Sequence, residues 1–238
     1  MSDLSVSVPL LRAAFWSLAP LLGAQGDPFL EVSSGVPDLG FVEPLLRRRL
    51  SPLGRAMLHC AGRVAEGLGP LPSVFASRHG EVARSLPILE DLARGLPSSP
   101  TQFSMNVHNA VAGVWSIVRQ DPSPSVSLAA GPETFGMGLL EAFALHVAGP
   151  TQPVLFVYAD EPLPAPFAAF ADREVPLHAV ALLIGLPAAK RLVFEREPGG
   201  AGEPAPLPQS LQALQALHSG HPQGPWAETD GTWRWAVD

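Results

Sequence analysis

Continuous runs of apolar residues predict the buried strands of a central sheet. Residues 154–158 and 179–184 are apolar throughout and of strand length, which is typical of strands covered on both faces. Residues 71–77 and 126–130 predict two more strands, and the strand at residues 126–130 is also expected to be covered on both faces. Residues 6–8 predict a strand near the N-terminus. The apolar pattern alone therefore indicates a sheet of several strands.

Helices are predicted between these strands. Residues 10–22 predict a short apolar helix that ends near Pro20, and residues 47–65 an amphipathic helix whose apolar side chains recur every three or four positions. Residues 87–92 and 133–147 predict two further helices. Because strands and helices alternate along the chain, we expect an α/β layered fold.

A corner between a strand and a helix is predicted within residues 125–136. Pro132 suits the first position of a helix, and Glu133 favours the positive end of the helix dipole. Enzymes place a reactive cysteine or serine at such a corner, because the helix N-terminus lowers a thiol pKa and stabilises an oxyanion. Pro132 has no nucleophilic side chain and no N–H, so the corner lacks this chemistry.

Composition narrows the class of protein. The 238 residues are 47% hydrophobic, enough for one substantial core, and the net charge of −7 argues against a nucleic-acid partner. Prolines and Arg12 interrupt the apolar N-terminal region, which also lacks a basic start, so we expect neither a membrane span nor a signal peptide. Cys60 is the only cysteine, so the chain can form no internal disulfide and has no pair of cysteines spaced to bind a metal ion. A reducing cytoplasm is the expected location.

The C-terminal part has its own pattern. Residues 198–208 are rich in proline and glycine and predict a linker. Residues 209–238 then predict a short helix and a tryptophan-rich segment. Trp233 and Trp235 alternate with Arg234, so both indoles face one way, and we expect this segment to pack on the core rather than remain exposed for a partner.

Two segments resemble the N-terminal half of a β-ketoacyl synthase, a condensing enzyme of the thiolase fold. They are residues 99–113, with the sequence SPTQFSMNVHNAVAG, and the corner at residues 125–136. The runs RRRLS at residues 47–51, FASRHGE at residues 75–81 and SMNVHN at residues 104–109 resemble more closely the chain-length-factor-like subunits of aryl polyene and xanthomonadin-type pathways.

The resemblance implies a thiolase-like layered fold, mainly the N-terminal half of a ketosynthase, over residues 1–197. It places Pro132 where the family has its acyl-accepting cysteine. We also expect the chain to end before a second half that would carry the family's histidines. A catalytically silent subunit is thus implied, which pairs as a heterodimer with an active β-ketoacyl-ACP synthase and receives substrate from an acyl carrier protein, with no cofactor and no metal.

Site residues follow from the same resemblance. Residues 99–113 are expected to run along the subunit interface toward the partner's acyl tunnel, where bulky side chains limit the length of the acyl chain. The expected tunnel and interface residues are Thr101, Gln102, Phe103, Met105, His108 and Asn109. A docking site for the acidic carrier protein is a further hypothesis, at Arg47, Arg48 and Arg49.

Other interpretations of these residues stay open. His108 and Asn109 are most simply a buried, hydrogen-bonded pair, and Glu133 a helix cap rather than a group that decarboxylates malonyl substrates. The chain could instead be an independent acyl-transfer or hydrolytic enzyme that uses Ser77, Ser104 or Cys60 with one of the seven histidines. It could also be a scaffold that recruits carrier proteins without shaping a tunnel.

Overall fold

The structure is a computed structural model that describes residues 4–18, 21, 29–97, 100–149, 152–171, 173, 176–199, 203–228 and 231–238. The strands are β1 (Leu4–Ser17), β2 (Leu30–Ser34), β3 (Ser73–Ala76), β4 (Ser125–Leu128), β5 (Val154–Asp160), β6 (His178–Ile184), β7 (Lys190–Pro198), β8 (Glu203–Pro204), β9 (Gln223–Glu228) and β10 (Gly231–Val237). The α-helices are α1 (Pro44–Arg49), α2 (Pro52–Val64), α3 (Val82–Ala93), α4 (Pro100–Phe103), α5 (Ala110–Arg119), α6 (Thr134–Ala148) and α7 (Gln209–Ser219), and short 3₁₀ helices are η1 (Gly131–Glu133) and η2 (Ala165–Phe170).

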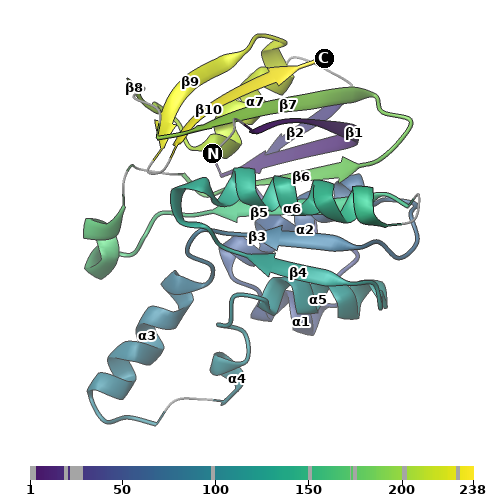
Figure 1. Cartoon of the computed structure of the whole chain (residues 1–238). Helices are drawn as coiled ribbons and strands as arrows, with labels where there is room; N and C mark the ends of the chain where they lie inside the picture. The colour runs from purple at the N-terminus through teal and green to yellow at the C-terminus, as the bar shows by residue number, and fades with distance from the viewer. Residues whose placement is uncertain are drawn as a thin grey trace.

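Within the described residues, one ten-stranded sheet runs through the molecule (Figure 1). Its strand order is β4-β3-β5-β6-β1-β7-β10-β9-β8, and β2 pairs with β1 off this path. Strands β3, β4 and β5 are parallel to one another, whereas β6 is antiparallel to β5. The layered α/β fold expected from the sequence is confirmed.

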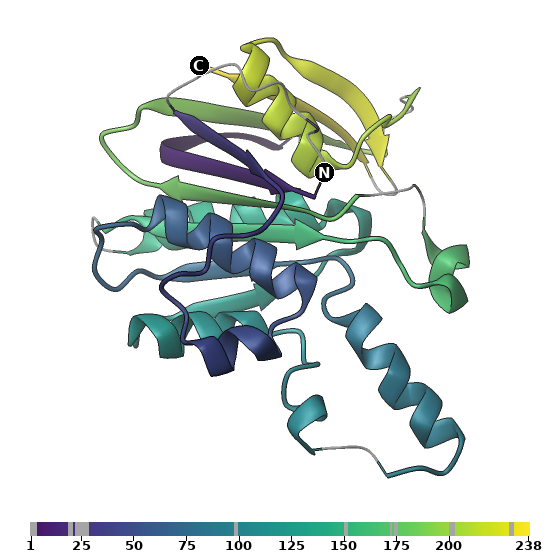
Figure 2. The ribbon, with the colours of Figure 1, turned by 180° about the vertical axis from the view of Figure 1, so that it is seen from behind.

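Helices cover both faces of the sheet and close two separate cores. Helix α6 lies in front of the sheet in Figure 1, whereas α2 and α7 lie in front of it in Figure 2. Helix α7 packs beside β10 and closes the same core as α6. Alternate residues of β5 enter different cores: Phe156 and Tyr158 lie with Phe135 of α6, whereas Leu155 and Val157 lie in the core beneath α2. This alternation explains why residues 154–158 of β5 are apolar on both faces of the strand.

The expected helix at residues 10–22 is wrong for the part that the structure describes. Residues 4–17 form one long strand, whose first half pairs with β7 and whose second half pairs with β6 and β2. Phe15 enters the core beneath α6, and Trp16 enters the core beneath α2. A short apolar run fits a buried strand as well as a buried helix, and here the place between β6 and β7 decides between them.

The amphipathic helix expected at residues 47–65 is two helices, α1 and α2. The break falls at Ser51, whose hydroxyl accepts a hydrogen bond from the Gly54 N–H at 2.9 Å, with Pro52 at the first helical position. Arg47, Arg48 and Arg49 consequently lie in the last turn of α1. They were expected at a helix start, but at a helix end the dipole favours their positive charge.

Two more expected elements differ from the structure. Residues 126–130 were expected to form a covered strand, but β4 is the last strand in the order above, and its residues are exposed or half-buried. Helix α3 begins at Val82, five residues before the expected start, and contains Pro87. By contrast, β5 and β6 are buried at every position as expected, and α6 follows the corner at Pro132.

The C-terminal residues complete the sheet. Strand β10 pairs with β7 from Gly231 to Val237, and α7 packs beside β10. Trp233 and Trp235 are fully buried and stack with 5.7 Å between ring centroids at an interplanar angle of 10°. The division into segments at residues 197 and 208 stays a prediction, and residues 200–202 of the expected linker lie outside the described residues.

Candidate functional site

The carboxyl ends of β3, β4 and β5 meet at one edge of the sheet, since the three strands are parallel. Ligands of α/β proteins bind outside such strand ends, which makes this edge the first place to look for a site. Arg78 follows β3, Pro132 follows β4, and Asp160 and Glu161 mark the end of β5. Helix α6 begins at the same edge, so the topology brings together the corner singled out in the sequence and the polar ends of two strands.

Two adjoining cavities open at this edge. The larger has a volume of about 670 Å³ and is lined by Arg78, His79, Asp160, Glu161, Pro162, Leu163, Ala168, Ala171, Arg173 and Pro176. The smaller holds about 20 Å³ and is lined by Arg78, Pro132, Phe135, Tyr158, Asp160, Arg173, Pro208 and Gln209. Arg78, Asp160 and Arg173 line both, so the two cavities adjoin, and the smaller one lies beside Pro132. We name the two together the corner recess.

The corner is held by hydrogen bonds and carries no nucleophile at position 132. Pro132 lies in η1, and Thr134 closes the turn: its hydroxyl donates to the Gly131 carbonyl at 2.7 Å and accepts from the Ala130 N–H at 2.9 Å. The positive φ of +55° at Gly131 favours glycine at this position. The corner geometry expected from the sequence is therefore present.

Glu133 does not cap α6 with its side chain, contrary to the expectation. Its carboxylate forms an ion pair with Arg196 of β7, with 3.0 Å between Arg196 Nη2 and Glu133 Oε2, and accepts a hydrogen bond from Trp233 Nε1 at 3.1 Å. The residue is buried and lines neither cavity of the corner recess. Glu133 thus ties the start of α6 to the C-terminal strands.

A buried serine–histidine pair that the sequence did not reveal lies behind the recess. His178 Nε2 is 2.7 Å from Ser210 Oγ, and His178 Nδ1 is 2.8 Å from the Pro176 carbonyl oxygen. A carbonyl only accepts, so Nδ1 carries the proton and Nε2 accepts from the Ser210 hydroxyl. Burial lowers the pKa of His178 to about 4. This is the proton arrangement of a general base, but both residues are completely buried and no substrate reaches them.

Ionisable groups around the recess are strongly perturbed. Burial raises the pKa of Asp160 to about 6, and burial together with the charges of Glu81 and Asp160 raises the pKa of Glu161 to about 7. Tyr158 donates a hydrogen bond to Asp160 Oδ2 at 3.3 Å, and burial raises the pKa of its phenol. Carboxyl groups that titrate near neutrality are common at binding sites, which supports the recess as the candidate site.

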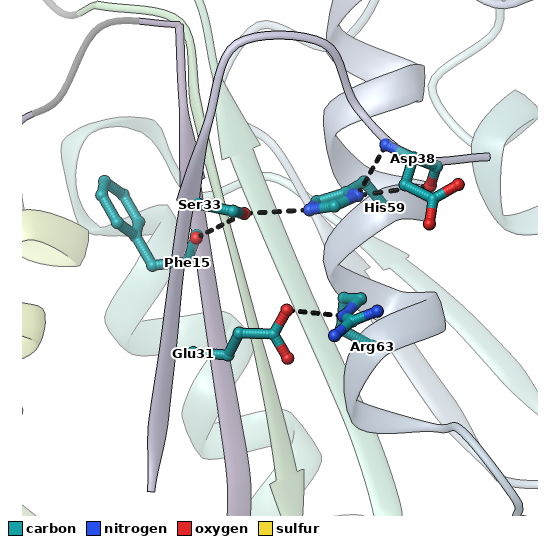
Figure 3. Close-up of polar contacts among 6 residues, drawn as sticks. All are labelled: Phe15, Glu31, Ser33, Asp38, His59 and Arg63. Atoms are coloured by element: carbon teal, nitrogen blue, oxygen red, sulfur yellow. Dashed lines mark hydrogen bonds and ion pairs between the residues drawn. The ribbon is translucent and has the colours of Figure 1, made fainter. Parts of the chain in front are cut away.

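A second serine–histidine pair joins β2 to α2 on the opposite face (Figure 3). His59 Nε2 is 2.9 Å from Ser33 Oγ, and His59 Nδ1 accepts from the Asp38 N–H at 2.9 Å. When Nδ1 accepts, the proton of a neutral imidazole is on Nε2 and is donated to Ser33, whose own hydroxyl donates to the Phe15 carbonyl. The ring cannot then take a proton from the serine. This pair holds β2 in place.

The nucleophiles that the sequence suggested are not activated. Cys60 is fully buried in α2, and burial raises the pKa of its thiol above the usual range. The Ser77 hydroxyl accepts from the Gly80 N–H at 3.0 Å, and His108 Nε2 donates to the Ser77 carbonyl rather than to its hydroxyl. The Ser104 hydroxyl accepts from Arg49 at 3.3 Å.

The expected interface segment is partly described. The side chains of Thr101 and Gln102 lie outside the described residues, whereas Phe103 is 61% exposed and Met105 is buried. His108 and Asn109 are both exposed, so their interpretation as a buried pair is wrong. Their exposure leaves them accessible from outside the chain.

Around this segment, α3 and α4 stand away from the sheet as an arm (Figures 1 and 2). Of the residues in α3, only Ile88 is buried. The arm exposes five large apolar side chains, Leu89, Leu92, Leu96, Phe103 and Val107.

The three arginines at residues 47–49, where carrier docking was expected, are only partly exposed. Arg47 is half-buried and donates to the Val42 carbonyl at 2.8 Å, whereas Arg48 and Arg49 are exposed.

Among the described residues there is no group of three or more histidine, cysteine or acidic side chains that could hold a metal ion. Nor does any described helix have the length and apolar character to cross a membrane.

Comparisons with known proteins agree with this fold. The family model described as "Beta-ketoacyl synthase, N-terminal domain" matches residues 23–236. A chain of the ketosynthase ApeO in complex with its chain length factor ApeC, from Xenorhabdus doucetiae, is 34% identical with a TM-score of 0.71; the match covers 82% of this chain and 81% of that one. It shares the thiolase-like fold. A search of curated proteins found no match.

More distant structures share the fold alone. The ishigamide ketosynthase/chain length factor is 15% identical with a TM-score of 0.56, over 71% of this chain and 55% of that one. A β-ketoacyl synthase from Burkholderia phymatum STM815 is 15% identical with a TM-score of 0.53, over 74% of this chain and 54% of that one. The chain spans about half the length of these two proteins.

Proposed function

The chain belongs to the β-ketoacyl synthase N-terminal domain family, and from this we propose that it is a non-catalytic, chain-length-factor-like subunit. It pairs with an active β-ketoacyl-ACP synthase in the cytoplasm and shapes its acyl tunnel in polyketide or fatty-acid-like biosynthesis of the aryl polyene type. The observation that carries the proposal is the 34% identity, over most of both chains, to a member of a ketosynthase–chain length factor complex, combined with proline at the nucleophile corner.

The chemistry of the corner supports a silent subunit. Pro132 supplies neither a nucleophile nor an N–H. The neighbouring Glu133 forms an ion pair with Arg196 and accepts a hydrogen bond from Trp233. Cys60 is fully buried in the core. The partner therefore supplies the acyl-accepting cysteine and the histidines, and this chain needs no cofactor and no metal.

The exposed arm and the edge strand support a large interface with that partner. An unpaired edge such as β4 tends to associate with another chain, and natural proteins cover or blunt such edges. The arm adds apolar side chains such as Leu89 and Leu92, each about half exposed. Obligate interfaces are large and apolar like a divided core, so we propose that the ketosynthase covers the arm and β4.

The tunnel role is assigned to residues 101–109. Thr101, Gln102 and Phe103 would limit the acyl tunnel of the partner, with Met105, His108 and Asn109 completing the contact. The 61% exposure of Phe103 leaves an aromatic ring available for this role. A buried methylene contributes about 0.8 kcal/mol, so excluding two or three carbons would shift chain-length preference by roughly one to two powers of ten.

Carrier docking is assigned to the end of α1. An acyl carrier protein is acidic, and Arg48 and Arg49 present exposed charges at a helix end, whereas Arg47 braces the preceding loop. The test is charge reversal of Arg48 and Arg49 together. It should weaken carrier binding to the complex, while reversal of Arg234, an exposed arginine on β10 away from α1, should not.

Co-expression with the ketosynthase encoded beside this chain tests the function. We expect a one-to-one complex in native mass spectrometry, and elongation of malonyl-carrier substrate only when both subunits are present. A monomer that turns over acyl thioesters unaided would overturn the proposal in favour of an independent enzyme. If the complex forms but its product length is insensitive to the tunnel residues, a scaffold is the correct assignment.

A matched pair of variants localises the interface. Leu92→Glu places a charge on the exposed face of the arm, and Val36→Glu places one at a site that is 94% exposed and lies off the arm. We expect the first to abolish co-purification and the second to leave it intact. Equal behaviour of the two would exclude the arm from the interface.

A further inference from the structure

A row of four buried side chains leads from the corner recess into the core. Asp160 of β5 lines both cavities of the recess, and its Oδ2 accepts from the Tyr158 hydroxyl at 3.3 Å. The Tyr158 hydroxyl is also in hydrogen-bonding contact with Ser210 of α7, and Ser210 Oγ lies 2.7 Å from Nε2 of His178 in β6. All four residues are at most 5% exposed. Three elements, β5, α7 and β6, thus meet along one row of polar groups.

This row has too few protons for every contact while Asp160 is ionised. Each hydroxyl has one proton to donate. Because His178 Nδ1 donates to the Pro176 carbonyl, His178 Nε2 takes the proton of Ser210. A carboxylate attracts the proton of Tyr158 more strongly than a neutral hydroxyl does. The phenol oxygen and the Ser210 oxygen are then in contact with no proton between them.

Protonation of Asp160 supplies the missing proton. Asp160 Oδ1 accepts from the Glu161 N–H at 3.2 Å, so Oδ2 is the oxygen that faces the phenol. A proton on Oδ2 is donated to the phenol oxygen, and Tyr158 turns its own proton to Ser210. From the carboxyl to the imidazole each group then donates to the next, after the rotation of one hydroxyl.

The groups around Asp160 place its protonation close to neutrality. Burial raises the pKa of Asp160 to about 6, although the Glu161 N–H, Tyr158 and the charge of Arg78 oppose the increase. The other titratable or charged groups that face it are His178, directly opposite on β6, and His79, Glu161 and Arg173, which line the recess. The two arginines and His79 have partners of their own as well. Among the described residues of α6 and α7, none with a charged side chain lines the recess. Because the pKa of His178 is about 4, its imidazole is still neutral when Asp160 takes up its proton.

We propose that Asp160 and Tyr158 form a pH-sensitive switch, in which protonation of the carboxyl at the recess turns the Tyr158 hydroxyl from Asp160 to Ser210. The completed chain of hydrogen bonds fastens α7 to β5 and β6. The device goes beyond the proposed function, since it needs neither a partner subunit nor an acyl group. It also gives the buried Ser210–His178 pair a role as the end of the chain.

Raman spectroscopy of the full chain tests the switch directly, because Tyr158 is the only tyrosine in the sequence. The intensity ratio of the two bands of the tyrosine Fermi doublet is low when the phenol only donates a hydrogen bond and rises when its oxygen accepts one. We expect the ratio to rise as pH falls, with a midpoint at about pH 6. A ratio that stays constant through this range would overturn the proposal.

Asp160→Asn shows whether this carboxyl is the group that titrates. The amide oxygen keeps the bond from the Glu161 N–H, which leaves the amide nitrogen facing the phenol as a donor. The variant imitates the protonated carboxyl, and we expect it to hold the ratio at its acidic value at every pH. If the ratio of this variant still titrates as in the parent chain, another group is responsible and the switch is not at Asp160.

Ser210→Ala removes the acceptor toward which the hydroxyl turns. Without it the protonated state loses a bond, so we expect the midpoint of the Raman titration to shift to lower pH. Ser219→Ala, which removes an exposed hydroxyl at the end of the same helix, is the matched control and should leave the midpoint in place. An equal midpoint in the two variants would exclude Ser210 from the chain.

Hydrogen exchange of the α7 amides measures the fastening itself. Relative to the intrinsic exchange rate at each pH, we expect slower exchange below pH 6 than above it. Tyr158→Phe has no hydroxyl to turn and should lose this dependence. Equal protection on both sides of pH 6 in the parent chain, or an undiminished dependence in Tyr158→Phe, would contradict the switch.

Discussion

The Glu133 carboxylate and the Arg196 guanidinium form a buried ion pair that joins the start of α6 to β7, with 3.0 Å between Arg196 Nη2 and Glu133 Oε2. Their side chains are only 8% and 14% exposed. The indole N–H of Trp233 donates to the same carboxylate. One acidic residue beside the corner thus serves the packing of the C-terminal strands.

Glu133→Gln is expected to destabilise the fold, since it removes the charge of Glu133 from its buried ion pair with Arg196. Breaking a buried pair costs about 3 kcal/mol, to be measured as the free energy of unfolding in urea. Glu195→Gln is the control, because the pair of Glu195 with Arg234 is nearly half exposed and should change stability by less than about 1 kcal/mol. Similar losses in both variants would contradict the structural role of Glu133.

Gly136→Ala is expected to destabilise the packing of α6 on the C-terminal strands. A Cβ at position 136 would clash with a ring carbon of Trp233, which is fully buried and cannot move away. Overpacking of this kind costs roughly 1–3 kcal/mol. Gly113→Ala in α5 is the matched control: its Cβ would meet nothing within 4 Å, and helix propensity should stabilise it by about 1 kcal/mol. Thermal unfolding of both variants checks the opposite signs.

His178 should make the fold sensitive to acid. Its pKa is about 4 when folded against 6.5 for the free side chain, so the unfolded chain takes up a proton first as pH falls. The contribution of His178 is complete above pH 6.5 and is lost between 6.5 and 4, by up to about 3 kcal/mol. The stability difference between the parent chain and His178→Gln, measured across this range, should shrink as pH falls. A constant difference would show that the histidine is not neutral in the folded protein.

Asp160 should act in the opposite direction. Its pKa of about 6 in the folded chain lies above the 3.8 of the free side chain, so the ionised carboxylate costs stability above pH 6, and this cost disappears as pH falls toward 4. Its size is up to about 3 kcal/mol. Relative to Asp160→Asn, the parent chain should therefore gain stability between pH 6 and 4. Urea titrations of the two proteins at several pH values measure the difference, and a relative loss would reverse the assignment.

Phe103→Ala is expected to lengthen the products of the complex with the ketosynthase, because it removes an exposed ring from the end of the proposed tunnel. Gln102→Ala should act in the same direction. Phe170→Ala is the matched control, since Phe170 is 69% exposed on η2 and lies outside residues 101–109. Mass spectrometry of the carrier-bound products provides the measurement. An unchanged product distribution for both tunnel variants, with complex formation intact, would refute the tunnel role.

Some elements could be predicted from the sequence because their local pattern admits one structure. Residues 154–158 and 179–184, which form most of β5 and β6, are continuous apolar runs of strand length, so they predict buried strands. The run Gly131-Pro132-Glu133 predicts the corner, because glycine allows the positive φ and proline starts the helix. The break at Ser51 and Pro52 also has a local signal, a capping serine before a proline, which the apolar spacing of the surrounding residues obscured.

The sequence by itself determined the layered fold, the proline at the corner between β4 and α6, and the resemblance to ketosynthases, since these depend on residue type and near neighbours. Only the tertiary structure decided that residues 10–17 are a strand, since their partners β6 and β7 lie more than 160 positions away along the chain. It alone joined His178 to Ser210, and Glu133 to a tryptophan 100 residues distant. Sequence spacing carries no record of such contacts, because the packing of the whole sheet on its helices creates them.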